Sequence, residues 1–153
     1  MLELRELYQE VILDHGKEPR NFGRPEGATC ESDGHNPLCG DTVTVYLRLL
    51  DDVVEDVGFD GRGCAISIAS ASMMTELLKG KSLNEIESMF VRFHQLVTDD
   101  EAVGKTGFEG EEFEKLMVLA GVREFPMRVK CATLAWHTMK AAVQGGGKEV
   151  TTE

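Results

Sequence analysis

The chain has 153 residues, of which 42% are hydrophobic and 28% are charged, and this composition suits one globular domain with its own core. Its 27 acidic and 16 basic residues give a net charge of -11, which disfavours nucleic acid and anionic membranes as partners. No apolar run approaches the roughly 18 residues of a membrane span, and the N-terminus has no signal-peptide pattern. We therefore expect a cytoplasmic protein with one domain over residues 1–145 and a flexible tail over 146–153.

The first predicted element is an amphipathic helix from residue 2 to about residue 15. Its apolar residues recur at steps of three and four, which places them on one helical face. His15 lies at the end of this pattern, where a histidine is favoured as a C-terminal cap by the helix dipole. A connector with Pro19 and Pro25 follows, and prolines prevent a helix or a central strand from continuing.

The middle of the chain predicts a β-hairpin. Residues 27–34 are a weak strand candidate, whereas residues 42–49 alternate clearly between apolar and polar side chains. A turn at Asp51 and Asp52 separates this strand from a returning strand over residues 53–60. Antiparallel pairing of the two long strands brings the residues before residue 42 and the residues after residue 60 to the same edge of the sheet.

Helices dominate the second half of the chain. Residues 65–78 are rich in small and apolar side chains and predict a largely buried helix. Ser82 and Glu85 form a capping box that begins another helix. Residues 98–112 are acidic and dotted with glycine, which is typical of a solvated loop inserted between elements. Helical spacing also follows residue 113, and a last helix runs from about residue 128 to residue 143, with Trp136 in the core or at its boundary.

The sequence contains four candidate ligands for one metal ion: Cys39, Asp41, Cys64 and Cys131. Three thiolates and a carboxylate make a complete tetrahedral ligand set for zinc, and each cysteine lies at a glycine-rich turn or at a predicted helix start. The spacing matches no compact zinc finger, so unrelated buried cysteines and a metal-free redox thiol remain alternatives. Cys30 has no partner at useful spacing, and we interpret it as a strand residue.

The motifs resemble those of the IscU/NifU-N-like scaffold family, specifically its SufU branch. The similarity runs from about Leu7 to Val143, and its motifs occur in the family's order: Tyr8 to His15 with Pro19–Gly23, Asn36–Asp41, Gly61–Ser67 leading to Ala69–Met73, and Arg128–Leu134. Typical IscU proteins have histidine immediately before the third cysteine, whereas this chain has Lys130. The acidic stretch before Cys131 is similar to the insertion of SufU-type proteins, and both features favour SufU.

The resemblance implies an α+β fold in which a small antiparallel sheet, of about three strands, packs against several helices. It also implies that Cys39, Asp41, Cys64 and Cys131 bind zinc, because a protonated Lys130 has no lone pair to offer a metal. The implied function is a zinc-dependent sulfurtransferase, in which Cys39 accepts persulfide sulfur from a SufS-like cysteine desulfurase. The sulfur then passes to a downstream iron–sulfur assembly scaffold.

The hypothesis assigns separate roles to Cys39 and Arg128, and two alternative functions stand beside it. In the family, a histidine of the desulfurase replaces the acceptor cysteine on zinc, which here would release Cys39 as the nucleophile. Arg128, one helical turn before Cys131, is a candidate catalytic residue that steadies Asp41 or the sulfur anion; a solvated charge at the helix start is the other interpretation. The chain could instead assemble and transfer a [2Fe-2S] cluster, or act as a structural zinc module that activates a desulfurase.

Overall fold

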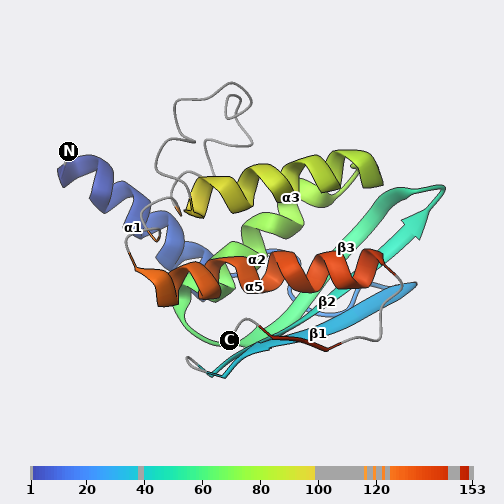
Figure 1. Ribbon diagram of the computed structural model, residues 1–153, viewed down its shortest axis with the longest axis horizontal. Coiled ribbons are helices and arrows are strands. Elements are labelled where there is room, and N and C mark those ends of the chain that lie inside the picture. The colour runs from blue at the N-terminus through green and yellow to red at the C-terminus, as the bar shows by residue number, and fades with distance from the viewer. Residues whose placement is uncertain are drawn as a thin grey trace.

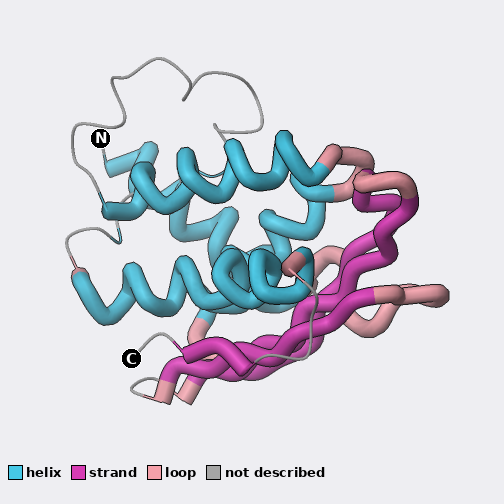
Figure 2. Tube along the Cα trace, turned by 45° about the vertical axis from the view of Figure 1, so that its right-hand side comes forward, coloured by secondary structure: helices cyan, strands magenta, loops and turns pink. Residues whose placement is uncertain are grey.

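The computed structural model describes residues 2–37, 40–98, 116, 119, 122, 125–144 and 149–151. In chain order the elements are α1 (Leu2–Lys17), β1 (Cys30–Asn36), β2 (Asp41–Leu50), β3 (Val53–Arg62), α2 (Ala65–Leu78), α3 (Leu83–Thr98), α5 (Pro126–Val143) and β4 (Glu149–Thr151). Figure 1 shows the helices gathered on one side of a twisted sheet, and Figure 2 shows the same two layers from a second direction. The expected α+β class is confirmed.

The predicted hairpin forms the centre of the sheet. Strands β2 and β3 pair in antiparallel fashion, with Thr42 opposite Arg62 at the end that leads to the site. Asp51 and Asp52 both have positive φ angles, 52° and 63°, as the tight turn of a twisted hairpin requires. Alternation along β2 buries Val43, Val45 and Leu47, which form part of the core beneath the helices.

Strand β1 pairs with β2 in antiparallel fashion and with the short strand β4 in parallel fashion, which gives the sheet order β3-β2-β1-β4. Strand β4 adds to the expected sheet of about three strands. Residues 149–151 are therefore a strand, although the sequence predicts a flexible tail there. The pairing explains the difference, because the edge of β1 offers backbone partners that no local pattern in the tail reveals.

Helices α2 and α5 contact the sheet, while α1 packs on α2 and α3 packs on α5. The close approach of α5 to β1 depends on Gly34, because a Cβ atom at this position would collide with the side chain of Thr138. Trp136 is fully buried and stacks on Phe93 of α3, with ring centroids 4.4 Å apart. Helix α5 is thus held between β1 and α3.

The capping box at the start of α3 is confirmed. The backbone N–H of Glu85 donates to the hydroxyl of Ser82, and the backbone N–H of Ser82 donates to the carboxylate of Glu85, at 3.2 and 3.3 Å. The predicted acidic loop over residues 98–112 lies outside the described residues except for Thr98, which ends α3. The helix predicted after residue 113 is described only at single positions, where Leu116, Leu119 and Val122 are buried.

Within the described residues, none of the helices is long and apolar enough to cross a membrane.

Candidate metal centre

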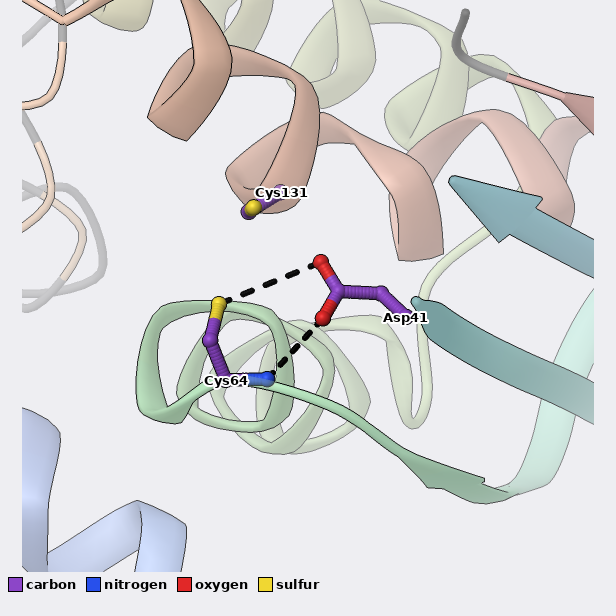
Figure 3. Close-up of side chains that lie close together, drawn as sticks. All are labelled: Asp41, Cys64 and Cys131. Atoms are coloured by element: carbon purple, nitrogen blue, oxygen red, sulfur yellow. Dashed lines mark hydrogen bonds between the residues drawn. The ribbon is translucent and has the colours of Figure 1, made fainter. Parts of the chain in front are cut away.

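Three elements bring the predicted ligands together. Asp41 is the first residue of β2, Cys64 is the N-cap of α2 directly after β3, and Cys131 lies in the second turn of α5. The antiparallel register of β2 and β3 places Asp41 and Cys64 at the same end of the hairpin, as the sequence predicts. Helix α5 then supplies Cys131 from above, and Figure 3 shows the three side chains converging from these separate elements.

The ligand atoms of Asp41, Cys64 and Cys131 all lie within 4.8 Å of one another. The carboxylate of Asp41 receives a hydrogen bond of 2.9 Å from the backbone N–H of Cys64 through Oδ1, while Oδ2 lies 3.9 Å from Cys64 Sγ (Figure 3). Because one oxygen is held by the backbone, the other is oriented toward the two sulfurs. The arrangement leaves three donor atoms facing a common point.

This donor set fits zinc. A zinc–sulfur bond of about 2.3 Å in a tetrahedron separates two sulfur ligands by about 3.8 Å, so ligand atoms within 4.8 Å need to move only slightly to share one ion. Asp41 and Cys131 have no exposed surface. Burial of the Asp41 carboxylate is costly unless a cation or hydrogen bonds compensate for the lost hydration. Cys64 is the N-cap residue of α2, and its sulfur lies near the ligand atoms of both other residues.

The glycine before Cys64 makes room for the carboxylate. A Cβ atom built on Gly63 would collide with Oδ1 of Asp41, so no other residue fits there without displacing that side chain. Packing thus explains Gly63 in the motif over residues 61–64, and ligand chemistry explains Cys64.

Arg128, the candidate catalytic residue, lies close to the sulfur atoms of Cys64 and Cys131. It is exposed in the first turn of α5, and the pKa of its guanidinium is raised, first by the negative charge of Cys64, then by that of Cys131, with side-chain hydrogen bonds to both sulfurs adding to the effect. A guanidinium always carries a positive charge in proteins, so it can attract an incoming sulfur anion.

The fourth predicted ligand, Cys39, lies outside the described residues. The residues that flank it are described: the backbone N–H of Gly40 donates a hydrogen bond of 2.9 Å to the carbonyl oxygen of Asn36. This bond joins the two ends of the segment that contains Cys39, immediately before Asp41. Cys30 is half-buried at the start of β1 and does not belong to the cluster, in agreement with its interpretation as a strand residue.

His15 lies in the last turn of α1, as the sequence predicts, and it is also buried. It is 8% exposed, and its Nδ1 lies 2.7 Å from the hydroxyl of Ser72, while its Nε2 lies 3.8 Å from Glu76. Ser72 also accepts a hydrogen bond from the backbone N–H of Arg20. The histidine therefore ties α1 and its connector to α2, a contact between residues far apart in the chain that a local pattern cannot indicate.

Two features of the site have no local signal in the sequence. Asn36 is fully buried, and its side-chain amide donates a hydrogen bond to Cys131 Sγ at 3.9 Å. An open apolar groove of about 610 Å³ also lies beside the site, lined by Ile66, Phe125, Pro126, Met127 and Arg128. Both arise only when α5 is placed over the sheet, which explains why neither was predicted.

An α+β domain with a cluster of thiols and a carboxylate at one end of its sheet defines a candidate metal-binding protein, and comparison with known proteins identifies the family. The family model for the NifU-like N-terminal domain matches residues 7–148. The chain belongs to this family, and the family resemblance found in the sequence motifs is confirmed.

Individual relatives fall into two named groups. The chain is 42% identical over 137 residues to the zinc-dependent sulfurtransferase SufU of Bacillus subtilis, covering 90% of this chain and 89% of that protein. It is 37% identical over 142 residues to the iron–sulfur cluster assembly scaffold protein IscU of Streptococcus pyogenes, covering 93% and 86%. A solved protein of Fervidobacterium islandicum AW-1, provisionally described as an assembly scaffold for the SUF system, superimposes with a TM-score of 0.76 at 35% identity, covering 88% and 94%.

Proposed function

We propose that this protein is a zinc-dependent sulfurtransferase that accepts persulfide sulfur from a pyridoxal-phosphate-dependent cysteine desulfurase for iron–sulfur cluster biogenesis. The observation that carries the proposal is the convergence of Asp41, Cys64 and Cys131, together with Lys130 at the position next to the third cysteine. This set needs only one more thiolate to close a tetrahedral zinc site, and Cys39 stands two residues before Asp41.

Zinc would be held by Cys39, Asp41, Cys64 and Cys131, and when bound it supplies a positive charge that keeps the thiols deprotonated at neutral pH. Asp41 and Cys131 are buried and held by hydrogen bonds, which suits them as permanent ligands. In the sequence, Cys39 comes between Asn36, which ends β1, and Asp41, which begins β2.

Cys39 is the proposed sulfur acceptor. Its thiolate attacks the outer sulfur of the desulfurase persulfide, a new S–S bond forms on Cys39, and the cysteine of the desulfurase leaves as a thiolate. No external oxidant or reductant is required, because the sulfane sulfur only changes its carrier. A downstream iron–sulfur assembly scaffold then receives this sulfur.

Arg128 is the second proposed participant. Its guanidinium faces the sulfur atoms of Cys64 and Cys131 and remains exposed, so it can meet the incoming persulfide while it stabilises the negative charge that moves between sulfurs. Lysine at this position would carry the charge without the planar fork of donors, so Arg128→Lys should support slower transfer than wild type.

The deciding experiment follows radiolabelled sulfur from a SufS-like cysteine desulfurase onto the purified zinc protein. Wild type should become labelled, Cys39→Ala should not, and Cys30→Ala provides the matched control because Cys30 is half-exposed and lies outside the cluster. If Cys39→Ala accepts as much sulfur as wild type, Cys39 is not the acceptor. If it still stimulates the desulfurase without accepting sulfur, the protein acts as an adaptor instead.

A second candidate function is assembly of a [2Fe-2S] cluster. The similarity to an IscU scaffold and the cysteine content favour it, since thiolates bind iron–sulfur clusters as well as zinc. Anaerobic purification separates the two functions. Stoichiometric zinc without visible absorption supports sulfur transfer, whereas a stable reconstituted cluster that moves to an apo-acceptor supports the scaffold.

A further inference from the structure

We propose that Asn36 is a positioning residue of the metal centre, and that its N–H···S hydrogen bond keeps Cys131 as a permanent ligand while sulfur transfer takes place on Cys39. The proposal rests on the metal site of the proposed function and assigns a role to a residue that is not itself a ligand.

The contact between the two side chains is fully buried. Nδ2 of Asn36 lies 3.9 Å from Sγ of Cys131, a length within the range of hydrogen bonds to the large sulfur atom, and neither residue has exposed surface. Burying an amide group without hydrogen bonds costs free energy, so an asparagine is stable in such a place only if its polar atoms are used. The sulfur of Cys131 is one of the atoms with which the amide of Asn36 makes a hydrogen bond.

The position of Asn36 connects the whole predicted ligand set. It is the last residue of β1 and stands opposite Asp41 in the strand register. Its carbonyl oxygen accepts the backbone N–H of Gly40, which joins the ends of the segment that contains Cys39. Its side chain also reaches Cys131 on α5. Asn36 therefore contacts or borders the parts of the chain that carry Cys39, Asp41 and Cys131.

The chemistry of an N–H···S bond gives this contact two effects. The donor fixes the orientation of the cysteine side chain, as supporting hydrogen bonds do for other metal ligands, and it withdraws electron density from the sulfur. A thiolate that receives such a bond is a weaker nucleophile. Cys131 is therefore kept on the metal and is less able to compete with Cys39 for the persulfide.

The test replaces the amide in the full-length protein. Asn36→Asp has nearly the same shape without the N–H donor, and Asn36→Leu removes all polarity. Ser32→Ala is the matched control, because Ser32 is buried on the same face of β1 two positions before Gly34. Zinc affinity is measured by chelator competition, and the sulfur-to-metal charge-transfer band is measured after cobalt(II) substitution.

We expect both Asn36 variants to lose zinc affinity by roughly 10- to 100-fold, the usual effect of losing a residue that supports a metal ligand. Their cobalt band should move to longer wavelength, because removing the N–H donor raises the energy of the sulfur electrons. Ser32→Ala should change neither quantity. If both Asn36 variants retain the wild-type affinity and the wild-type band, the proposal is wrong.

A measurement on wild type covers the case in which the variants do not fold. In protein loaded with cadmium-113, a hydrogen bond to a metal-bound sulfur transmits a scalar coupling from the metal to the donated proton. We expect this coupling at the side-chain amide of Asn36, and its absence overturns the proposal. Failure of wild type to bind zinc or cobalt contradicts the proposed function itself, whereas normal binding without the coupling contradicts only the role of Asn36.

Discussion

The backbone N–H of Cys64 donates a hydrogen bond of 2.9 Å to Oδ1 of Asp41, and this bond joins the first residue of β2 to the N-cap of α2. The carboxylate therefore has two separable roles, one structural and one as a charged ligand. Asparagine can accept the same hydrogen bond but carries no charge, whereas alanine loses both functions.

Asp41→Asn should fold like wild type and bind zinc much more weakly, with a loss greater than the roughly 10- to 100-fold expected for a residue that only supports a ligand. Asp41→Ala should also be less stable, by about 1–3 kcal/mol, because the N–H of Cys64 loses its partner. Chelator competition and urea denaturation of the metal-free proteins measure these two effects. Equal zinc affinity for Asp41→Asn and wild type would show that Asp41 is not a ligand.

Gly63→Ala tests the space that the site requires. The added methyl group would collide with the carboxylate of Asp41, so we expect weaker zinc binding and a stability loss of about 1–3 kcal/mol. Gly80→Ala is the matched control: Gly80 has a φ angle of 87° that strains alanine, but a Cβ atom there would meet nothing within 4 Å. Thermal unfolding and zinc titration of both variants decide the point, and an equal loss of zinc affinity would contradict the collision argument.

Variants of Ser70 and Trp136 test how α5 is held in place. The hydroxyl of Ser70 donates to the carbonyl of Ala132 and accepts the indole N–H of Trp136 at 3.2 Å, all in the buried interior. Ser70→Ala should cost about 1–3 kcal/mol in urea denaturation, because a buried indole N–H is left without its acceptor. Adding Trp136→Phe removes that donor, so the double variant should be less destabilised than the sum of the two single variants. Simple additivity would contradict this coupling.

Local patterns predict the elements whose stability is local. The alternation along residues 42–49, the turn at Asp51 and Asp52, and the capping box at Ser82 each contain their own physical reason, and the structure has all three. Strand β4 was missed because it exists only through pairing with β1, and three residues carry no pattern of their own.

The site, like the fold, has parts that the sequence predicts and parts that it does not. Asp41 and Cys64 could be placed together from the sequence, since hairpin register alone decides which residues meet at its open end. Cys131 was a candidate ligand from its chemistry and its place at a predicted helix start, but no local pattern indicates how α5 crosses the sheet, and the family motifs were needed to choose among the alternatives. The contact from Asn36 to Cys131 spans that crossing and could not be predicted at all. Cys39 as a ligand and acceptor stays a prediction.

A pair of histidines away from the site gives a prediction for pH. His137 of α5 lies 5.9 Å from His94 of α3, measured between ring centroids, and Phe90 packs against both rings. Burial lowers the pKa of His137 below its ordinary value of 6.5, and the nearby positive charges of His94 and Lys140 lower it further. The folded protein therefore resists protonation of this imidazole.

As the pH falls through 6.5, the unfolded chain takes up a proton at this residue while the folded chain resists it, so stability decreases until the lowered pKa is reached. Wild type should lose more stability between pH 7.5 and pH 5.5 than His137→Gln, and His94→Gln should lie between them because it removes one of the causes. Both variants keep the metal ligands, so differences in urea denaturation isolate the histidine pair. An identical loss in wild type and His137→Gln would mean that His137 does not resist protonation in the folded state.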